Sequence, residues 1–140
     1  MVPFVVVNWV SIIVAAIGAF IVGMLWYSPA LFGKQWMKMM GMSEKDMKAG
    51  KDKMTGMMVV TLVLGVISAW VLSHVFNYAG VVTMMDGVFV AAMMWLGFYA
   101  TSTYMGVMYE KKSMEWWYLT AGHYLVSLIV MGLVLVQMGY

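Results

Sequence analysis

The sequence has 140 residues, of which 64% are hydrophobic and only 10% are charged. Soluble domains are roughly 25% charged, so this composition excludes an ordinary water-soluble domain. The net charge is +2 and every basic residue is a lysine, so the chain lacks arginine for bidentate phosphate contacts and we expect no nucleic-acid partner.

Four apolar runs are each long enough to cross a bilayer, and they cover residues 4–27, 57–79, 87–109 and 116–137. At about 1.5 Å of rise per residue, each can span a hydrocarbon layer of about 30 Å with some tilt. The first run ends in Trp26 and Tyr27 instead of a small-residue cleavage site, so we expect a retained span. The sequence predicts an all-α fold, a polytopic bundle of four transmembrane helices forming one membrane domain over residues 1–140.

The connecting segments 28–56 and 110–115 hold all eight lysines. Loops rich in lysine and arginine stay on the cytoplasmic side of a membrane. We therefore predict that both loops are cytoplasmic and that the N- and C-termini lie outside.

The first loop begins with an alternation of apolar and basic residues that is typical of an amphipathic surface segment. Phe32 and Trp36, four residues apart, would dip below the head groups of the lipid bilayer. Lys34 and Lys38 would meet anionic lipid, at about 1 kcal/mol each. We expect this segment to lie on the membrane surface, and a protein-docking site is the alternative.

Two local signals divide the same loop. Pro29 cannot continue a helix interior and biases Ser28 away from the α region, which predicts a chain break at the inner interface. Ser43 followed three residues later by Asp46 predicts a helix start.

The first two spans carry ridges of small residues at i+4 spacing. In lipid, such ridges let helix backbones approach closely. We predict close packing within the bundle or between subunits, and a substrate groove is the alternative reading of the same residues. The predicted packing positions are Ala15, Ala19, Gly23, Gly65 and Ala69.

Polar side chains fall at two depths in the predicted bundle. The outer group is Asn8, Ser73, His74 and Asn77, and the inner group is Thr101, Ser102, Thr103, Thr120, His123, Tyr124 and Ser127. The last four of these are spaced i, i+3, i+4 and i+7, so they share one helix face that should turn away from lipid. They either hydrogen-bond across the third and fourth helices or line a small hydrated site around His123, which could exchange protons near neutral pH.

Catalytic and metal sites find little support in this sequence. The chain has no cysteine, which excludes thiolate ligands and nucleophiles. Ser127 and His123 are one turn apart, but no carboxylate lies at their depth. The 19 methionines are scattered through every span, so we interpret them as flexible packing instead of copper(I) ligands. We expect no enzyme activity, no cofactor and no metal site.

The N-terminal third resembles a known family. The residues that carry the likeness are Asn8, Trp9, Trp26, Tyr27, Ser28, Pro29, Phe32, Gly33, Lys34 and Trp36. In these positions the chain is similar to domain-of-unknown-function family 1761, which comprises small bacterial and archaeal membrane proteins. The resemblance implies a four-helix membrane fold in a prokaryotic inner membrane and brings no catalytic residues.

Together these features predict a non-catalytic integral membrane protein that acts by assembling. It would form a homo-oligomer or join other membrane subunits, because the small-residue ridges offer packing surfaces. The alternative is a small-solute or ion channel or transporter that uses the inner polar group around His123.

Overall fold

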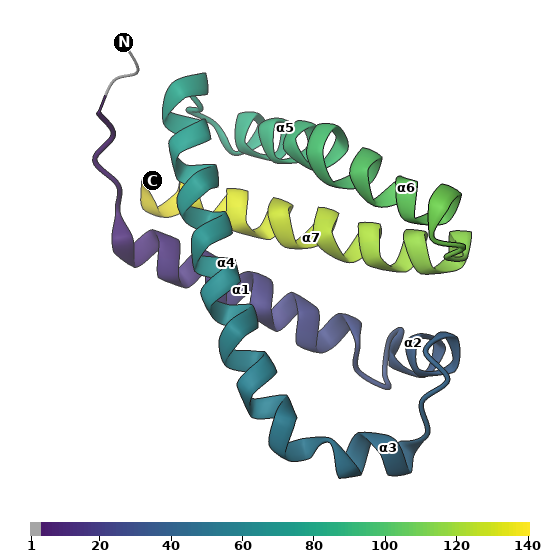
Figure 1. The fold of residues 1–140 in the computed structure, drawn as a ribbon. Helices are drawn as coiled ribbons and strands as arrows, with labels where there is room; N and C mark the ends of the chain where they lie inside the picture. Colours follow the sequence, from purple (N-terminus) through teal and green to yellow (C-terminus); the bar gives the residue numbers. More distant parts are fainter. Residues whose placement is uncertain (1–3) are drawn as a thin grey trace.

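The computed structural model describes residues 4–140, which fold into helices joined by short turns (Figure 1). The helices are Trp9–Trp26 (α1), Gly33–Met39 (α2), Glu44–Ala49 (α3), Lys51–Ala79 (α4), Met84–Met94 (α5), the π-helical Trp95–Ala100 (η1), Thr101–Tyr109 (α6) and Met114–Met138 (α7). α5, η1 and α6 form one continuous helix. This helix, α1, α4 and α7 are each long and apolar enough to cross a membrane. The predicted all-α class with four candidate spans is confirmed.

Polar caps set the starts of α1, α5 and α7, so their bounds differ from those of the apolar runs. α1 begins at Trp9 and not at residue 4, because the Asn8 side chain accepts hydrogen bonds from the N–H groups of Val10 and Ser11. α5 begins at Met84, three residues before the expected start, because Thr83 and Asp86 form a capping box.

The N-terminal ends of α4 and α7 also extend past the apolar runs. α4 begins at Lys51, six residues before the expected start, and its first turn contains the good helix formers Lys51, Lys53 and Met54 together with Asp52, whose charge is favourable at a helix N-terminus. α7 begins at Met114 because the Ser113 hydroxyl accepts a hydrogen bond from the N–H of Trp116. Capping therefore sets the start of α7, whereas α4 begins early without a side-chain cap.

Three of the long helices lie side by side, with α7 between α1 and the α5–η1–α6 helix, and α4 crosses this layer obliquely (Figure 1). α4 contacts α1 most extensively, and α5 packs on α7. The lysine-rich α2 and the α6–α7 turn lie at one end of the layer, and the start of α1 and the end of α7 lie toward the other (Figure 1).

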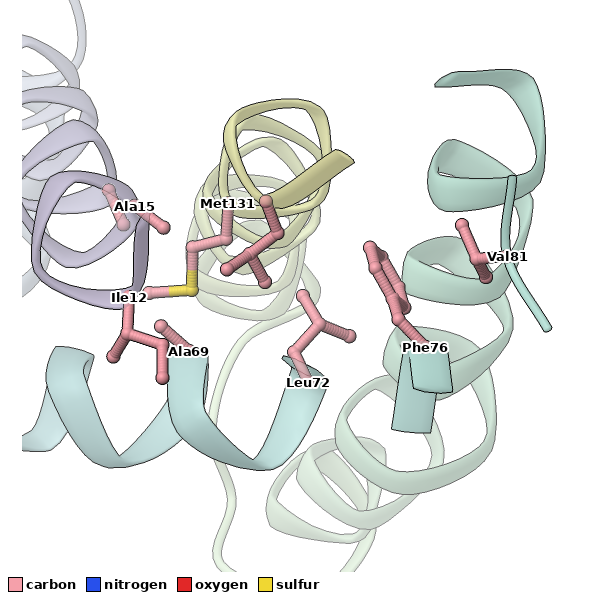
Figure 2. Packing of buried hydrophobic residues seen from close by; sticks show 9 residues of the cluster. Ile12, Ala15, Ala69, Leu72, Phe76, Val81 and Met131 are labelled. Atoms are coloured by element: carbon pink, nitrogen blue, oxygen red, sulfur yellow. The ribbon is translucent and has the colours of Figure 1, made fainter. Parts of the chain in front are cut away.

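The hydrophobic core lies where α4 crosses α1 and α7. Ile12, Ala15 and Ala69 are fully buried there, and Figure 2 shows Met131 of α7 pointing toward Ile12 of α1. Among the predicted packing positions, Ala15, Ala19 and Ala69 belong to this core. A Cβ on Gly65 would lie 3.6 Å from that of Ala16, so the glycine lets the two backbones approach.

The turn after α1 folds the chain back against the end of that helix. The N–H of Phe32 donates to the carbonyl of Trp26, and the N–H of Gly33 donates to that of Ser28. A Cβ on Gly33 would lie 2.4 Å from the carbonyl oxygen of Tyr27, so only glycine fits this position. The expected break near Pro29 is present, and α1 ends three residues before it.

α3 begins as predicted. The Ser43 hydroxyl accepts a hydrogen bond from the Asp46 N–H, and the Asp46 carboxylate accepts from the Ser43 N–H. This reciprocal pair is a complete capping box. The predicted helix start at Ser43 is confirmed.

Candidate functional site

His123 lies on α7 against the C-terminal end of α1. Its ring centroid is 5.2 Å from that of Tyr27 and 6.1 Å from that of Trp26. A Cβ on Gly23 would come within 3.2 Å of His123 Nε2, so the glycine makes room for the imidazole ring. Gly23, predicted as a helix-packing position, therefore forms one wall of the histidine site.

Only one member of the inner polar group lies within hydrogen-bond distance of the imidazole. Ser127 Oγ and His123 Nε2 are 3.3 Å apart. The carbonyl one turn before the histidine, that of Leu119, accepts a hydrogen bond from the indole N–H of Trp26 at 3.1 Å. Trp26 of α1 thus occupies the Leu119 carbonyl, to which the His123 side chain on the same helix could otherwise donate a hydrogen bond.

The threonine and serine hydroxyls of α6 bond to their own helix and do not reach α7. Thr101 donates to the Gly97 carbonyl at 2.8 Å, Ser102 donates to that of Phe98, and Thr103 donates to that of Tyr99 at 2.7 Å. Thr101 and Ser102 are exposed. Thr120 likewise donates to the carbonyl of Trp116, at 2.8 Å. The structure therefore does not bring the seven inner residues together in one cluster.

Three tryptophans make polar contacts between the long helices, and the sequence interpretation missed this role. Their indole N–H groups donate to α7 and η1 carbonyls: Trp26 to Leu119 at 3.1 Å, Trp95 to Ala121 at 2.8 Å, and Trp117 to Ala100 at 3.2 Å. A buried indole N–H usually finds an acceptor, and in hydrocarbon an unpaired one is costly. The presence of tryptophan within or at the end of an apolar span was the sequence signal that could have predicted these hydrogen bonds.

The π-helical segment η1 adjusts the register of its helix against α7. Gly87 and Ala91 face α7 at a spacing of four, and the next two α7 contacts, through Trp95 and Ala100, are five residues apart. A spacing of five matches a π turn and keeps both residues on the α7 side. The three α6 hydroxyls bond carbonyls of this segment, so we assign them a backbone-stabilising role there.

η1 also places Tyr99 against Tyr124 of α7. Their rings are stacked, with centroids 3.9 Å apart and planes inclined by 19°. Tyr124 is turned edge-on to the His123 ring at 5.6 Å. A row of aromatic and imidazole rings therefore runs from Tyr27 across α7 to Tyr99.

The outer polar residues have separate local roles. Asn8 caps α1, and its amide also donates to the Met138 carbonyl at 3.2 Å, which links the start of α1 to the end of α7. His74 Nδ1 lies 2.9 Å from the carbonyl of Trp70, and the Asn77 amide donates to that of Ser73 at 3.0 Å. The Ser73 hydroxyl is fully buried and lacks a hydrogen-bond partner among residues 4–140.

The predicted surface segment is α2, which is held against the bundle. Phe32 packs on Trp26 at 4.7 Å between ring centroids, and Trp36 packs on Tyr27 at 5.8 Å. Lys34 and Lys38 are exposed. The Gln35 amide donates to Glu115 at 2.6 Å and joins α2 to the start of α7.

The match between this chain and a protein family covers nearly all of the helices described above. The family model spans residues 10–136. The chain belongs to the DUF1761 family. That family is described as a protein of unknown function, so membership supports the fold and leaves the activity open. No curated protein and no solved structure matches the chain significantly.

The carboxylates of this DUF1761 chain lie near helix ends and not beside His123. Asp86 belongs to a capping box, Glu110 pairs with Lys112 at 3.0 Å, and Glu115 binds Gln35. Within residues 4–140, no three His, Cys, Asp or Glu side chains form a group that could hold a metal ion. The groups around His123 that could contact a ligand or another protein are therefore the serine–histidine pair, the aromatic rings and the apolar helix faces.

Proposed function

We propose that this DUF1761 chain is a non-catalytic membrane protein that acts by assembling, either with copies of itself or as an accessory subunit of a larger membrane complex. The observation that carries this proposal is the position of the N-terminal half of α4. That half leads away from the other three long helices (Figure 1).

The two halves of α4 have opposite environments. Ala69, Leu72 and Phe76 are buried in the core, whereas every residue from 51 to 64 is exposed. Met57 is 67% exposed and Val59 59% exposed, and these two residues, two positions apart, point to nearly opposite sides of the helix. Lipid-embedded helices usually pack one side on neighbours through close van der Waals contact. An apolar half-helix exposed on all sides is available for helices of another subunit.

We propose an orientation with both termini outside a prokaryotic inner membrane. The lysine-rich segments at one end of the layer support it, through the bias of basic residues toward the cytoplasm. A tag inserted at Lys48 should be accessible only from the cytoplasmic side. Accessibility of the tag from the outside of intact cells would show that the orientation is the opposite of the one proposed.

The absence of cysteine from the sequence permits a direct test of assembly. A Val60→Cys variant, cross-linked in its own membrane, should give an adduct that native mass spectrometry resolves as two copies or as one copy plus another protein. Met105→Cys, at an exposed position on α6, is the matched control and should stay monomeric. A Val60→Cys chain that cross-links no more than the control would refute assembly through α4.

Permeation of a small solute or ion is the second candidate, supported by the His123–Ser127 contact within the membrane-length part of α7. An intramembrane histidine with a polar partner is typical of proton pathways. If this candidate holds, His123→Leu should abolish proton flux into vesicles that contain the protein, and Ser127→Ala should reduce it. Equal flux through protein-containing and empty vesicles would rule it out.

A further inference from the structure

A lateral groove lies between α4, the α5–η1 segment and α7, and its volume is about 300 Å³. α4 contributes Ile67 and Val71, and the opposite wall contains Phe98, Tyr99 and Tyr124. None of its lining side chains is charged. The groove is therefore suited to an uncharged and largely apolar ligand.

The two tyrosines place hydrogen-bond donors beside this apolar surface. Within residues 4–140, the only tyrosine hydroxyl that donates a hydrogen bond to the protein is that of Tyr140. Among the residues that the structure describes, the hydroxyls of the stacked Tyr99 and Tyr124 therefore have no hydrogen-bond partner. The remaining polar side chain of the groove, Ser68, already donates to the Leu64 carbonyl at 3.0 Å.

Both tyrosines lie near the middle of their helices. Tyr99 is ten residues from the helix end at Tyr109, and Tyr124 is ten residues from the start of α7 at Met114. At about 1.5 Å per residue, both lie about 15 Å from the lysine-rich end, which is the centre of a hydrocarbon layer of about 30 Å. Water is scarce at that depth, and an unpaired hydroxyl there is costly.

A ligand that pairs these hydroxyls must therefore be uncharged and must have a hydrogen-bond acceptor that lies at the bilayer centre. The ester groups of ordinary phospholipids stay at the interface, so their acyl chains would fill the groove but leave both hydroxyls unpaired. A carbonyl group on a flat ring satisfies the hydroxyls, and an attached hydrocarbon tail can leave through the open side of the groove. The π turn that sets the position of Tyr99 adds to this reading, because such turns are frequent at functional sites.

We propose that the groove between α4, η1 and α7 binds a lipid-soluble carbonyl compound of the isoprenoid-quinone class, with Tyr99 and Tyr124 donating hydrogen bonds to its carbonyl oxygens. This site is separate from the N-terminal half of α4 through which the protein is proposed to assemble.

The test uses the full chain in lipid nanodiscs and two probes with the same ten-carbon tail, one on a benzoquinone ring and the other on a benzene ring. Binding is measured by equilibrium partition, with empty nanodiscs subtracted. Two added hydrogen bonds should make the quinone probe bind about tenfold more tightly than the benzene probe. Val71→Trp, which fills the groove from α4, should remove specific binding of both.

Phenylalanine variants isolate the hydroxyls while retaining the stacked rings. Tyr99→Phe and Tyr124→Phe should each lower the preference about threefold, and the double variant should bind both probes equally. Tyr109→Phe removes an exposed hydroxyl at the helix end and should retain the full preference. Equal binding of the two probes by the unmodified protein would identify the groove as an acyl-chain site and overturn the proposal. An unchanged preference in the double variant would overturn it too.

Discussion

The indole N–H of Trp26 donates to the carbonyl of Leu119 at 3.1 Å, and this bond joins the last turn of α1 to α7 one turn before His123. The same tryptophan packs on Phe32, at the start of the returning chain. Trp26 thus connects α1, α7 and the turn that leads to α2. Its removal should affect more of the structure than the loss of a single hydrogen bond.

Trp26→Phe should lower the free energy of unfolding by about 1–2 kcal/mol, because the Leu119 carbonyl loses its donor while an aromatic ring remains in place. Unfolding in mixed micelles measures the change. Trp9→Phe is the control, since Trp9 is 57% exposed and should change stability very little. Equal stabilities for the two variants would contradict a structural role for this bond.

Gly33→Ala should release α2 from the end of α1. The added methyl group would sit 2.4 Å from the Tyr27 carbonyl oxygen, and a backbone contact that short forces the turn to open. The expected result is a loss of the Trp36–Tyr27 packing, seen as a shift of the Trp36 signal in the fluorine NMR spectrum of the fluorotryptophan-labelled protein, in which every tryptophan is retained. Gly56→Ala is the matched control, because its Cβ would meet open space within a helix, where alanine is favourable. If Gly33→Ala and Gly56→Ala leave the spectrum equally unchanged, the tight turn is not what holds α2.

Ser73→Ala should leave the protein as stable as before or raise its unfolding free energy by about 1 kcal/mol, because it removes a buried hydroxyl that has no partner in the described part of the chain. Ser11 offers a close comparison, since it is also fully buried but its hydroxyl donates to the Asn8 carbonyl at 2.8 Å. Ser11→Ala should destabilise the protein by about 1 kcal/mol. A stability loss in Ser73→Ala that matches the loss in Ser11→Ala would show that Ser73 has a partner in the membrane.

The capping box of α3 should respond to acid. The Ser43 hydroxyl and N–H donate to the Asp46 carboxylate and lower its pKa below the ordinary value of 3.8. A lowered pKa means that the box stabilises α3 fully above about pH 3.8 and loses this contribution as the pH falls through the lower value of the folded chain. Carboxyl NMR of the aspartate-labelled protein should show Asp46 titrating below 3.8 and moving upward in Ser43→Ala. A midpoint at 3.8 in the unmodified protein would exclude the box in solution.

Local features of the sequence were enough to predict the spans and the start of α3. Long apolar runs mark helices that cross a bilayer, and the Ser43–Asp46 spacing marks a capping box, because each depends on residues close together in the chain. The bounds shifted where polar caps such as Asn8 and Thr83 competed with hydropathy. The resemblance to the DUF1761 family rested on residues 8–36, and the family match extends over the other helices.

The candidate sites were predicted less completely, because their members come from different helices. The spacing of Thr120, His123, Tyr124 and Ser127 placed them on one side of a helix, but His123 faces α1 while Tyr124 stacks on Tyr99. Helical spacing predicts a shared face and does not specify which neighbouring helix covers each part of it.

The sequence by itself determined the four apolar helices, the clustering of lysines and the helix caps, since hydropathy, charge and capping act over a few residues. Only the tertiary structure decided that α7 lies between α1 and the α5–η1–α6 helix, that a π turn brings Tyr99 to Tyr124, and that half of α4 leaves the bundle. These features depend on side-chain packing between segments far apart in the chain, where a one-residue change of register turns a different side chain toward the neighbouring helix.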